Sequence, residues 1–470
     1  MMITTTIKRN YAVGAAANGV KTDMFTFFLL FFYTNIAGLQ PALAGLAILI
    51  ALCVDAVTDP LMGTISDRTN SRWGRRHPYM FISFVPITIG YILLFLPNPS
   101  WNVTQTGLFL WMVSFAILTR VGMTLFDVPH RGLGAELSKD YEERVSIMSW
   151  RELFGWLAGL TNAFLGYFIF LRSTPDYERG MLNPDAYLPF AVAGAVIIIF
   201  SILFSSSKTL QVGKSLSKWT GSIKFIDILN ELKIALSNRS FLRLFFINLT
   251  LAIAWGLGNA LTLYVNTFFW EFSSVQITAF LPVYALCTYF AFLITPRIIK
   301  QYDKKYIVIL SLCIVSFFTL MPFTFFNLGL TPEKGSWSLI PFLSSFLIVG
   351  MTFNIIGIMT RDSMLGDISD EVELESGKRQ EGILYAAISF MGKVNTGLGS
   401  FTAGLVLSLI GFKGSNSTDS EIYSLLIIQG PVVACLVLIP AFLVYKYKIT
   451  RKKHAEIISE LNKKNKDIYI

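Results

Sequence analysis

Apolar stretches of about 20 residues alternate along the chain with short polar segments that carry most of its charges. As a helix, a stretch of this length crosses the roughly 30 Å hydrocarbon core of a bilayer. All of them should be helices, because lipid offers no partners to an open backbone. The pattern predicts twelve transmembrane helices, at 12–37, 41–66, 78–97, 107–129, 149–171, 188–206, 238–270, 274–296, 305–327, 337–364, 381–411 and 424–446.

Composition excludes a water-soluble protein and disfavours a nucleic-acid partner. Hydrophobic residues make up 53% of the 470 positions and charged residues only 15%, where soluble domains carry about 25%. The net charge is +9, but the basic residues are scattered over loops and form no stripe or recognition motif. The expected partners are the lipid bilayer and a small-molecule substrate, and we expect a monomer.

The basic residues also predict the orientation of the chain. With a cytoplasmic N-terminus, the outer loops hold only four of the 39 Lys and Arg residues, namely Arg172, Arg179, Lys334 and Lys413. Cytoplasmic loops of membrane proteins carry such an excess of positive charge. Both termini are therefore predicted to be cytoplasmic, in a plasma membrane that compact loops suggest is a bacterial inner membrane.

The longest polar connection, 208–237, divides the spans into two sets of six. This layout predicts an all-α protein with the major facilitator architecture. Its parts are an N-terminal six-helix half with the cation site (1–207), a cytoplasmic linker (208–237), a C-terminal six-helix half (238–447) and a basic cytoplasmic tail (448–470).

Two carboxylates, Asp55 and Asp59, interrupt the second apolar stretch. Their i, i+4 spacing places them on one helix face. A charge near the middle of a bilayer costs at least about 2.5–3.5 kcal/mol, and two bare like charges would also repel each other. We expect a cation between them, or a proton on one of them.

The fourth stretch adds Thr124 and Asp127, three residues apart and so also on one face. Carboxylate and hydroxyl oxygens are hard ligands that suit sodium, and carboxylates can share a proton. Pro60 and Pro129 leave another explanation open, in which the aspartates only end helices near the inner interface.

Lys393 is the matching basic residue, inside the eleventh stretch. Such a lysine either extends to the interface or pairs with a carboxylate. We favour a pairing with the aspartates, for which a bound cation would compete. Trp255 and Asn259 are candidate substrate contacts, although helix packing explains such residues equally well.

A loop after the second stretch carries Asp67, Arg68, Arg75 and Arg76. Its pattern is close to the G-x-x-x-D-R/K-x-G-R/K-R/K signature of the major facilitator superfamily. Such residues can bond helix ends and stabilise one gated state. The alternative is that they only fix topology, but Asp67 contributes nothing to a count of Lys and Arg.

Many motifs in order resemble the glycoside-pentoside-hexuronide cation symporters, a family of the major facilitator superfamily that includes melibiose permease. They are Asp55-x-x-x-Asp59-Pro60, Trp73-Gly74-Arg75-Arg76, Asp127-x-Pro129, Glu136-Leu137, Asp140 to Arg144 with Arg151, Gly366-Asp367 with Asp370-Glu371, Gly377 to Gly382, and Lys393. The resemblance covers nearly the whole chain.

The resemblance implies alternating access and a cation site on the second and fourth helices. By position it implies that Asp55, Asp59 and Thr124 coordinate the ion, with Thr58 where the permease has an asparagine. Asp127 and Arg151 match positions near the sugar, and Lys393 matches a lysine of the family. Four further residues are assigned to gating loops: Arg144, Asp367, Asp370 and Arg379.

The departures from the family lie on the cargo side. Asn18 and Gly19 stand where the permease has a lysine and its sugar-binding aspartate, and Arg131 stands where it has a stacking tryptophan. Asp23, one turn further on, could replace the aspartate or could pair with Lys21. Asn18 and Asp23 are therefore substrate candidates.

The function expected is symport of a sugar, glycoside or related solute with sodium or a proton, without a cofactor. An alternative cargo is a lysophospholipid or another amphiphile, because the family includes carriers of lysophospholipids. An alternative of another class is a non-transporting receptor or scaffold, for which the charged cluster has no use. An enzyme is not expected, because the chain has three histidines and no nucleophile, Walker or metalloprotease motif.

Overall fold

The structure is a computed structural model that describes residues 4–138, 141–215, 238–376 and 381–468. Within these ranges the secondary structure is helical, apart from an isolated bridge between Thr174 and Tyr177. The chain forms two compact units. Unit 1 is Met1–Gly221 with Thr262–Thr278 and Ser400–Glu421, and unit 2 is Ser222–Leu261 with Ala279–Gly399 and Ile422–Ile470.

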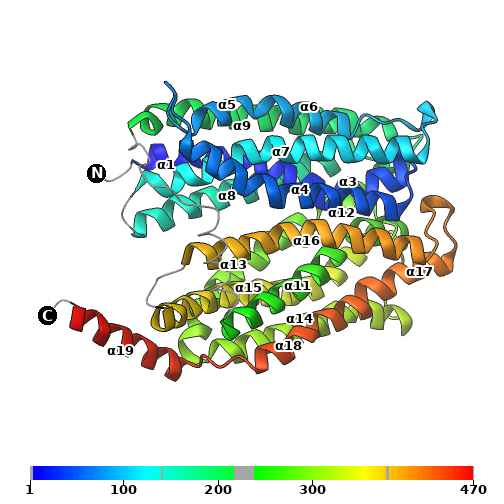
Figure 1. The fold of residues 1–470 in the computed structure, drawn as a ribbon. Coiled ribbons are helices and arrows are strands. Elements are labelled where there is room, and N and C mark those ends of the chain that lie inside the picture. The colour runs from blue at the N-terminus through cyan, green and yellow to red at the C-terminus, as the bar shows by residue number, and fades with distance from the viewer. Residues whose placement is uncertain (1–3, 139–140, 216–237, 377–380, 469–470) are drawn as a thin grey trace. The chain divides into compact units, whose positions relative to one another are not determined.

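The helices of unit 1 come mostly from the first half of the chain (Figure 1). The principal ones are α1 (Thr5–Val13), α2 (Ala15–Asp23), α3 (Leu29–Phe31), α4 (Pro41–Arg68), α5 (His77–Ile82), α6 (Phe84–Leu94), α7 (Gln105–Leu137), α8 (Tyr141–Leu165) and α9 (Tyr187–Ser215). Two π-helical turns, η1 (Met24–Phe28) and η2 (Phe32–Ile36), flank α3, and η4 (Gly166–Phe170) extends α8.

The remaining helices follow residue 238. They are α11 (Arg239–Tyr264), α12 (Ser274–Thr278), α13 (Leu281–Gln301), α14 (Lys304–Asn327), α15 (Leu339–Ser376), α16 (Glu381–Leu409), α17 (Asp419–Ile427), α18 (Val433–Tyr445) and α19 (Arg451–Ile468). The π turns η7 (Val265–Phe269) and η9 (Ile428–Val432) continue α11 and α17. The C-terminal ends of α11 and α16 belong to unit 1 and the rest of both helices to unit 2.

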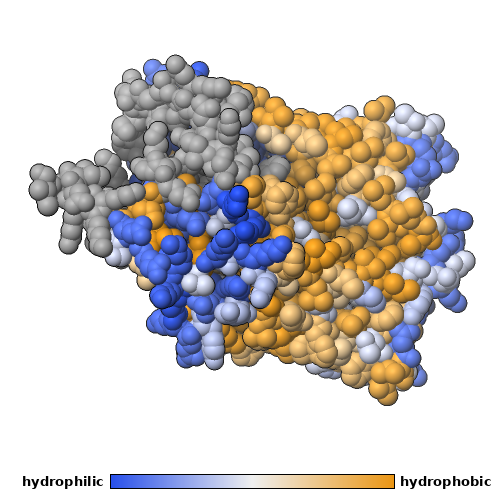
Figure 2. Space-filling view, turned by 60° about the horizontal axis from the view of Figure 1, so that its bottom comes forward, coloured by the Kyte–Doolittle hydropathy of each residue, from blue (hydrophilic) through white to orange (hydrophobic). Residues whose placement is uncertain are grey.

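Among the described residues, eleven helices are long and apolar enough to cross a membrane, and they correspond to eleven of the predicted spans. The twelfth, predicted at 12–37, is helical from α1 to η2, but Asn18, Lys21 and Asp23 make it less apolar. On the face seen in Figure 2, hydrophobic residues cover a broad surface with hydrophilic residues at its margins. The predicted all-α fold is confirmed. The predicted half boundaries and the cytoplasmic termini stay predictions, and most of the linker lies outside the described residues.

A backbone contact brings α2 and α8 close together in unit 1. A Cβ atom at Gly19 would overlap the carbonyl oxygen of Gly155. Because neither residue has a side chain, the two helices approach at this point as closely as their backbones allow. This contact fixes the position of α8, and with it Arg151, against the first span.

Candidate functional site

Two side-chain pairs join α4 to α7 in unit 1. Arg120 Nη1 donates to Asp55 Oδ2 at 2.6 Å, and one turn further on Thr124 Oγ1 donates to Asp59 Oδ1 at 2.7 Å. On each helix the two paired residues are four positions apart, and the residue numbers of both helices rise in the same direction from the first pair to the second. The second and fourth spans therefore run parallel, as two spans separated by one crossing must.

The Arg120–Asp55 pair is deeply buried. Arg120 is 3% exposed and Asp55 4%. The guanidinium carbon of Arg120 also lies 5.0 Å from the ring centroid of Phe25, which belongs to η1. A cation over an aromatic face is attracted by the ring electrons. Arg120 is thus held by a carboxylate and by an aromatic ring from another helix.

A cation is predicted beside Asp55 from the sequence, but Arg120 is not among the predicted site residues. The signal was present, because Arg120 is a charged residue within the fourth apolar stretch. It lies four residues before Thr124 and seven before Asp127, which places all three on one helix face. What the sequence did not reveal is which of the carboxylates on α4 this face would meet.

Asp127 binds two arginines. Arg151 Nη2 donates to Asp127 Oδ1 at 2.5 Å and Arg131 Nε to Asp127 Oδ2 at 2.7 Å. Arg151 also contacts Glu152 at 2.7 Å. The four charges sum to zero, which lowers the cost of placing them in a membrane span. The structure thus joins Asp127 and Arg151, and adds Arg131, whose side chain is 45% exposed.

Asp23 and Asn162 form a buried pair between α2 and α8. Asn162 Nδ2 donates to Asp23 Oδ2 at 2.7 Å. This bond gives Asp23 a role in helix packing, and its role in binding a substrate stays a prediction. Asn18 is half-buried on α2. At the next position, the contact between Gly19 and Gly155 leaves no room for any side chain.

The other predicted site residues are placed as follows. Thr58 lies on α4, and its hydroxyl is buried without a hydrogen-bond partner among the described residues. Trp255 and Asn259 are half-buried on the part of α11 that belongs to unit 2. Lys393 is half-buried on the unit 2 part of α16, and its pairing with the aspartates of unit 1 stays a prediction.

The predicted gating loop of unit 1 forms a network. Arg76 Nη2 donates to Asp67 Oδ1 at 3.0 Å and to Glu136 Oε1 at 2.6 Å, and Arg76 Nη1 donates to the Pro129 carbonyl oxygen at 3.3 Å. Arg75 also bonds Glu136. This bond raises the pKa of Arg75. The network ties the end of α4 and the start of α5 to the end of α7.

Two other gating candidates of unit 1 lie apart from this network. Arg68 is exposed at the end of α4. Arg144 Nε donates to the carbonyl oxygen of Ser138 at 2.7 Å, which fastens the start of α8 to the end of α7. Their part in gating stays a prediction.

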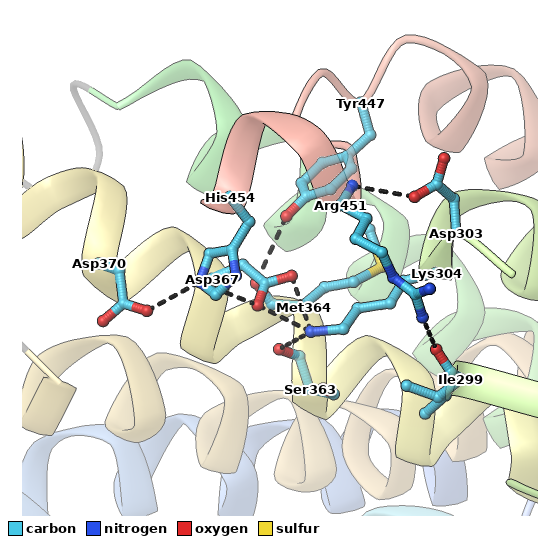
Figure 3. A network of polar contacts seen from close by, with 10 residues as sticks. All are labelled: Ile299, Asp303, Lys304, Ser363, Met364, Asp367, Asp370, Tyr447, Arg451 and His454. Atoms are coloured by element: carbon cyan, nitrogen blue, oxygen red, sulfur yellow. Dashed lines mark hydrogen bonds and ion pairs between the residues drawn. The ribbon is translucent and has the colours of Figure 1, made fainter. Parts of the chain in front are cut away.

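Unit 2 has a corresponding network where α14, α15 and α19 meet (Figure 3). Lys304 Nζ contacts both oxygens of Asp367, at 2.7 and 2.8 Å. His454 Nε2 lies 2.9 Å from Asp370 Oδ2 and 3.5 Å from Asp367 Oδ1. Asp367 and Asp370, predicted from the motif, are thus bound to a residue of α19. Arg379 lies outside the described residues.

The donor set of the α4–α7 pairs bears on the predicted sodium site. Among the described residues, no group of three or more His, Cys, Asp and Glu could hold a metal ion. Carboxylate and hydroxyl oxygens are hard ligands of the kind that suit sodium. Asp55 already binds a cation of the chain itself through Oδ2, and coordination of a sodium ion by Asp55, Asp59 and Thr124 stays a prediction.

Comparisons with known proteins identify the family. Residues 10–451 match the family described as MFS/sugar transport protein. An uncharacterized symporter of Synechocystis is 26% identical, over 99% of this chain and 98% of the relative. The isoprimeverose transporter of Lactiplantibacillus pentosus is 26% identical, over 88% of this chain and 82% of the relative.

Solved structures agree on the fold. The inward-open xylose transporter of Escherichia coli superposes with a TM-score of 0.63 at 15% identity, covering 97% of this chain and 99% of the transporter. The resemblance to the glycoside-pentoside-hexuronide symporters and the expectation of a carrier rather than an enzyme are confirmed. The chain belongs to the MFS/sugar transport protein family.

Proposed function

We propose that this protein is a cation-coupled symporter of a sugar, glycoside or related organic solute that works by alternating access. The observation that carries the proposal is the two polar pairs between α4 and α7, one buried and one partly buried, within a chain of this family. Charged groups inside a membrane span are costly, and they commonly mark ion and substrate pathways.

Asp59 carries the coupling in this proposal. The hydroxyl of Thr124 donates a hydrogen bond to Asp59 and brings a second hard oxygen ligand beside its carboxylate; Asp55 is bonded to the guanidinium of Arg120. The coupling ion, sodium or a proton, acts on the carboxylate of Asp59. Ion and cargo binding must then favour each other equally, because the coupling between two binding sites is reciprocal.

The cluster of Asp127, Arg131 and Arg151 binds the cargo in this proposal. Its carboxylate accepts hydrogen bonds from sugar hydroxyls, and its guanidiniums donate to oxygen atoms. Arg131 is the most exposed of the three and replaces the aromatic residue on which the family's permease stacks its sugar. A planar guanidinium binds a carboxylate with two parallel bonds, so glycosides of uronic acids belong in the first panel tested.

The test is uptake by proteoliposomes that contain the purified full chain. Labelled sugars, glycosides, uronides and lysolipids are offered under an imposed sodium gradient, an imposed pH gradient or none. We expect one of the first three classes to accumulate under one gradient. In the matched Asp59→Asn variant, accumulation should fall at least about tenfold while exchange of labelled for unlabelled cargo without a gradient continues.

Two results would contradict the proposal. Undiminished gradient-driven accumulation in Asp59→Asn would remove the coupling role from this residue. Uptake of a lysolipid and of no sugar, glycoside or uronide would replace the proposed cargo by the amphiphile alternative.

A further inference from the structure

Arg120 places a positive charge beside Asp55. Its Nη1 lies 2.6 Å from Asp55 Oδ2, and both residues are almost wholly buried. The two aspartates on this face of α4 bring two negative charges into the span, and Arg120 returns one positive charge. Without Arg120, a bound cation or a proton on one aspartate would have to offset that charge.

Arg120 cannot easily give way to a metal ion. Its guanidinium is held between Asp55 and the face of Phe25, and an arginine stays protonated at any physiological pH. Two positive charges repel each other strongly in a medium of low dielectric constant. A sodium ion that shared Asp55 would therefore meet a fixed like charge and lose one oxygen ligand to it.

The described elements of unit 1 that pack against α4 include α3, η2, α7 and the C-terminal end of α16. Of these, α3, η2 and residues 400–409 of α16 carry no charged residue. On α7, the next acidic residue beyond Thr124 is Asp127, which is already bonded to Arg131 and Arg151. The positive charge of Arg120 thus acts on the site without a further compensating carboxylate from α7.

We infer that Arg120 is a built-in counter-cation that fills the sodium position at Asp55, so that this chain binds no sodium between Asp55 and Asp59. Arg120 is then the residue that determines which ion the carrier uses. The inference rests on the proposed cation coupling, in which it leaves the proton as the coupling ion. It concerns ion binding without cargo, so its failure is distinguishable from a failure of the uptake experiment.

The test compares thermal unfolding of the detergent-solubilised full chain in sodium chloride and in choline chloride at equal ionic strength. A ligand that binds only the folded state raises the unfolding midpoint with its concentration. We expect equal midpoints in both salts for the wild type. In Arg120→Gln, sodium chloride should raise the midpoint above its value in choline chloride, and the rise should saturate with sodium concentration.

Two matched variants control this comparison. Arg120→Lys keeps the positive charge and should resemble the wild type in its insensitivity to sodium. Asp55→Asn/Arg120→Gln replaces the ion pair by a neutral pair of similar size, and should fold without gaining a sodium response. Together the two variants show whether a sodium response of Arg120→Gln arises from the lost positive charge or from the lost packing of the arginine side chain.

The inference is overturned if sodium raises the wild-type midpoint and Asp55→Asn abolishes that effect, or if folded Arg120→Gln ignores sodium. If Arg120→Gln folds in neither salt, equilibrium binding of radioactive sodium to the wild type decides. Binding of about one sodium ion per chain that is lost in Asp55→Asn refutes the inference. The inference is supported if the wild type binds no sodium at concentrations up to about 100-fold above the half-saturating concentration of a sodium-dependent control carrier.

Discussion

Ion pairs in two regions of this carrier have the same chemistry and different surroundings. The ion pair between α7 and α4, called the span pair below, joins Arg120 and Asp55, whose side chains are 3% and 5% exposed. In the network of unit 2, the side chain of Lys304 is 23% exposed and that of Asp367 9%. Water competes for the second pair and hardly reaches the first. The contribution of an ion pair should therefore follow its burial rather than its distance.

The largest effect is expected from breaking the span pair. Arg120→Gln leaves Asp55 buried without its guanidinium, which costs about 3–5 kcal/mol of folding free energy. The measurement is reversible unfolding in mixed micelles, in sodium-free buffer. Asp55→Asn/Arg120→Gln should recover most of the loss, and a double variant as unstable as the single one would show that the cost arises from packing.

An intermediate effect is expected at the gating network of unit 1. Arg76 connects Asp67, Glu136 and the carbonyl oxygen of Pro129. Arg76→Gln loses charge-assisted bonds and should cost about 1.5–3 kcal/mol. The same unfolding assay measures it. Arg68→Gln, an exposed neighbour on the same loop, is the matched control and should lie within about 0.5 kcal/mol of the wild type.

The smallest effect is expected in unit 2. Lys304→Gln should cost about 1 kcal/mol, because water can replace part of what Asp367 loses. Lys453→Gln is the control, since it removes only an exposed i, i+3 pair with Glu456 and should change stability by less than about 0.5 kcal/mol. A loss at Lys304 equal to that at Arg120 would contradict the dependence on burial.

The spans were predictable because lipid imposes a simple requirement on each helix by itself. Helices α4 and α14 begin and end within a few residues of the predicted spans 41–66 and 305–327. The i, i+4 spacing of Asp55 and Asp59 likewise predicted that both lie on one face of the helix. The first predicted span, 12–37, is helical from α1 to η2, and its crossing of the membrane stays a prediction.

The partners of the site residues were harder to predict, because they depend on how two helices are rotated against each other. The i, i+4 rule places Arg120 and Thr124 on one face of α7, but it does not say that this face meets Asp55 and Asp59. The Asp23–Asn162 bond joins residues 139 positions apart. No local pattern in the sequence signals such a bond.

The contact between Gly19 and Gly155 has a consequence for how cargo preference can evolve in this lineage. A mutation that introduced an aspartate at position 19 would first have to separate two helices that touch through their backbones. A side chain at this position therefore has to move a helix before it can reach any solute. Arg131 on α7 is 45% exposed, so its side chain can be exchanged without such a movement.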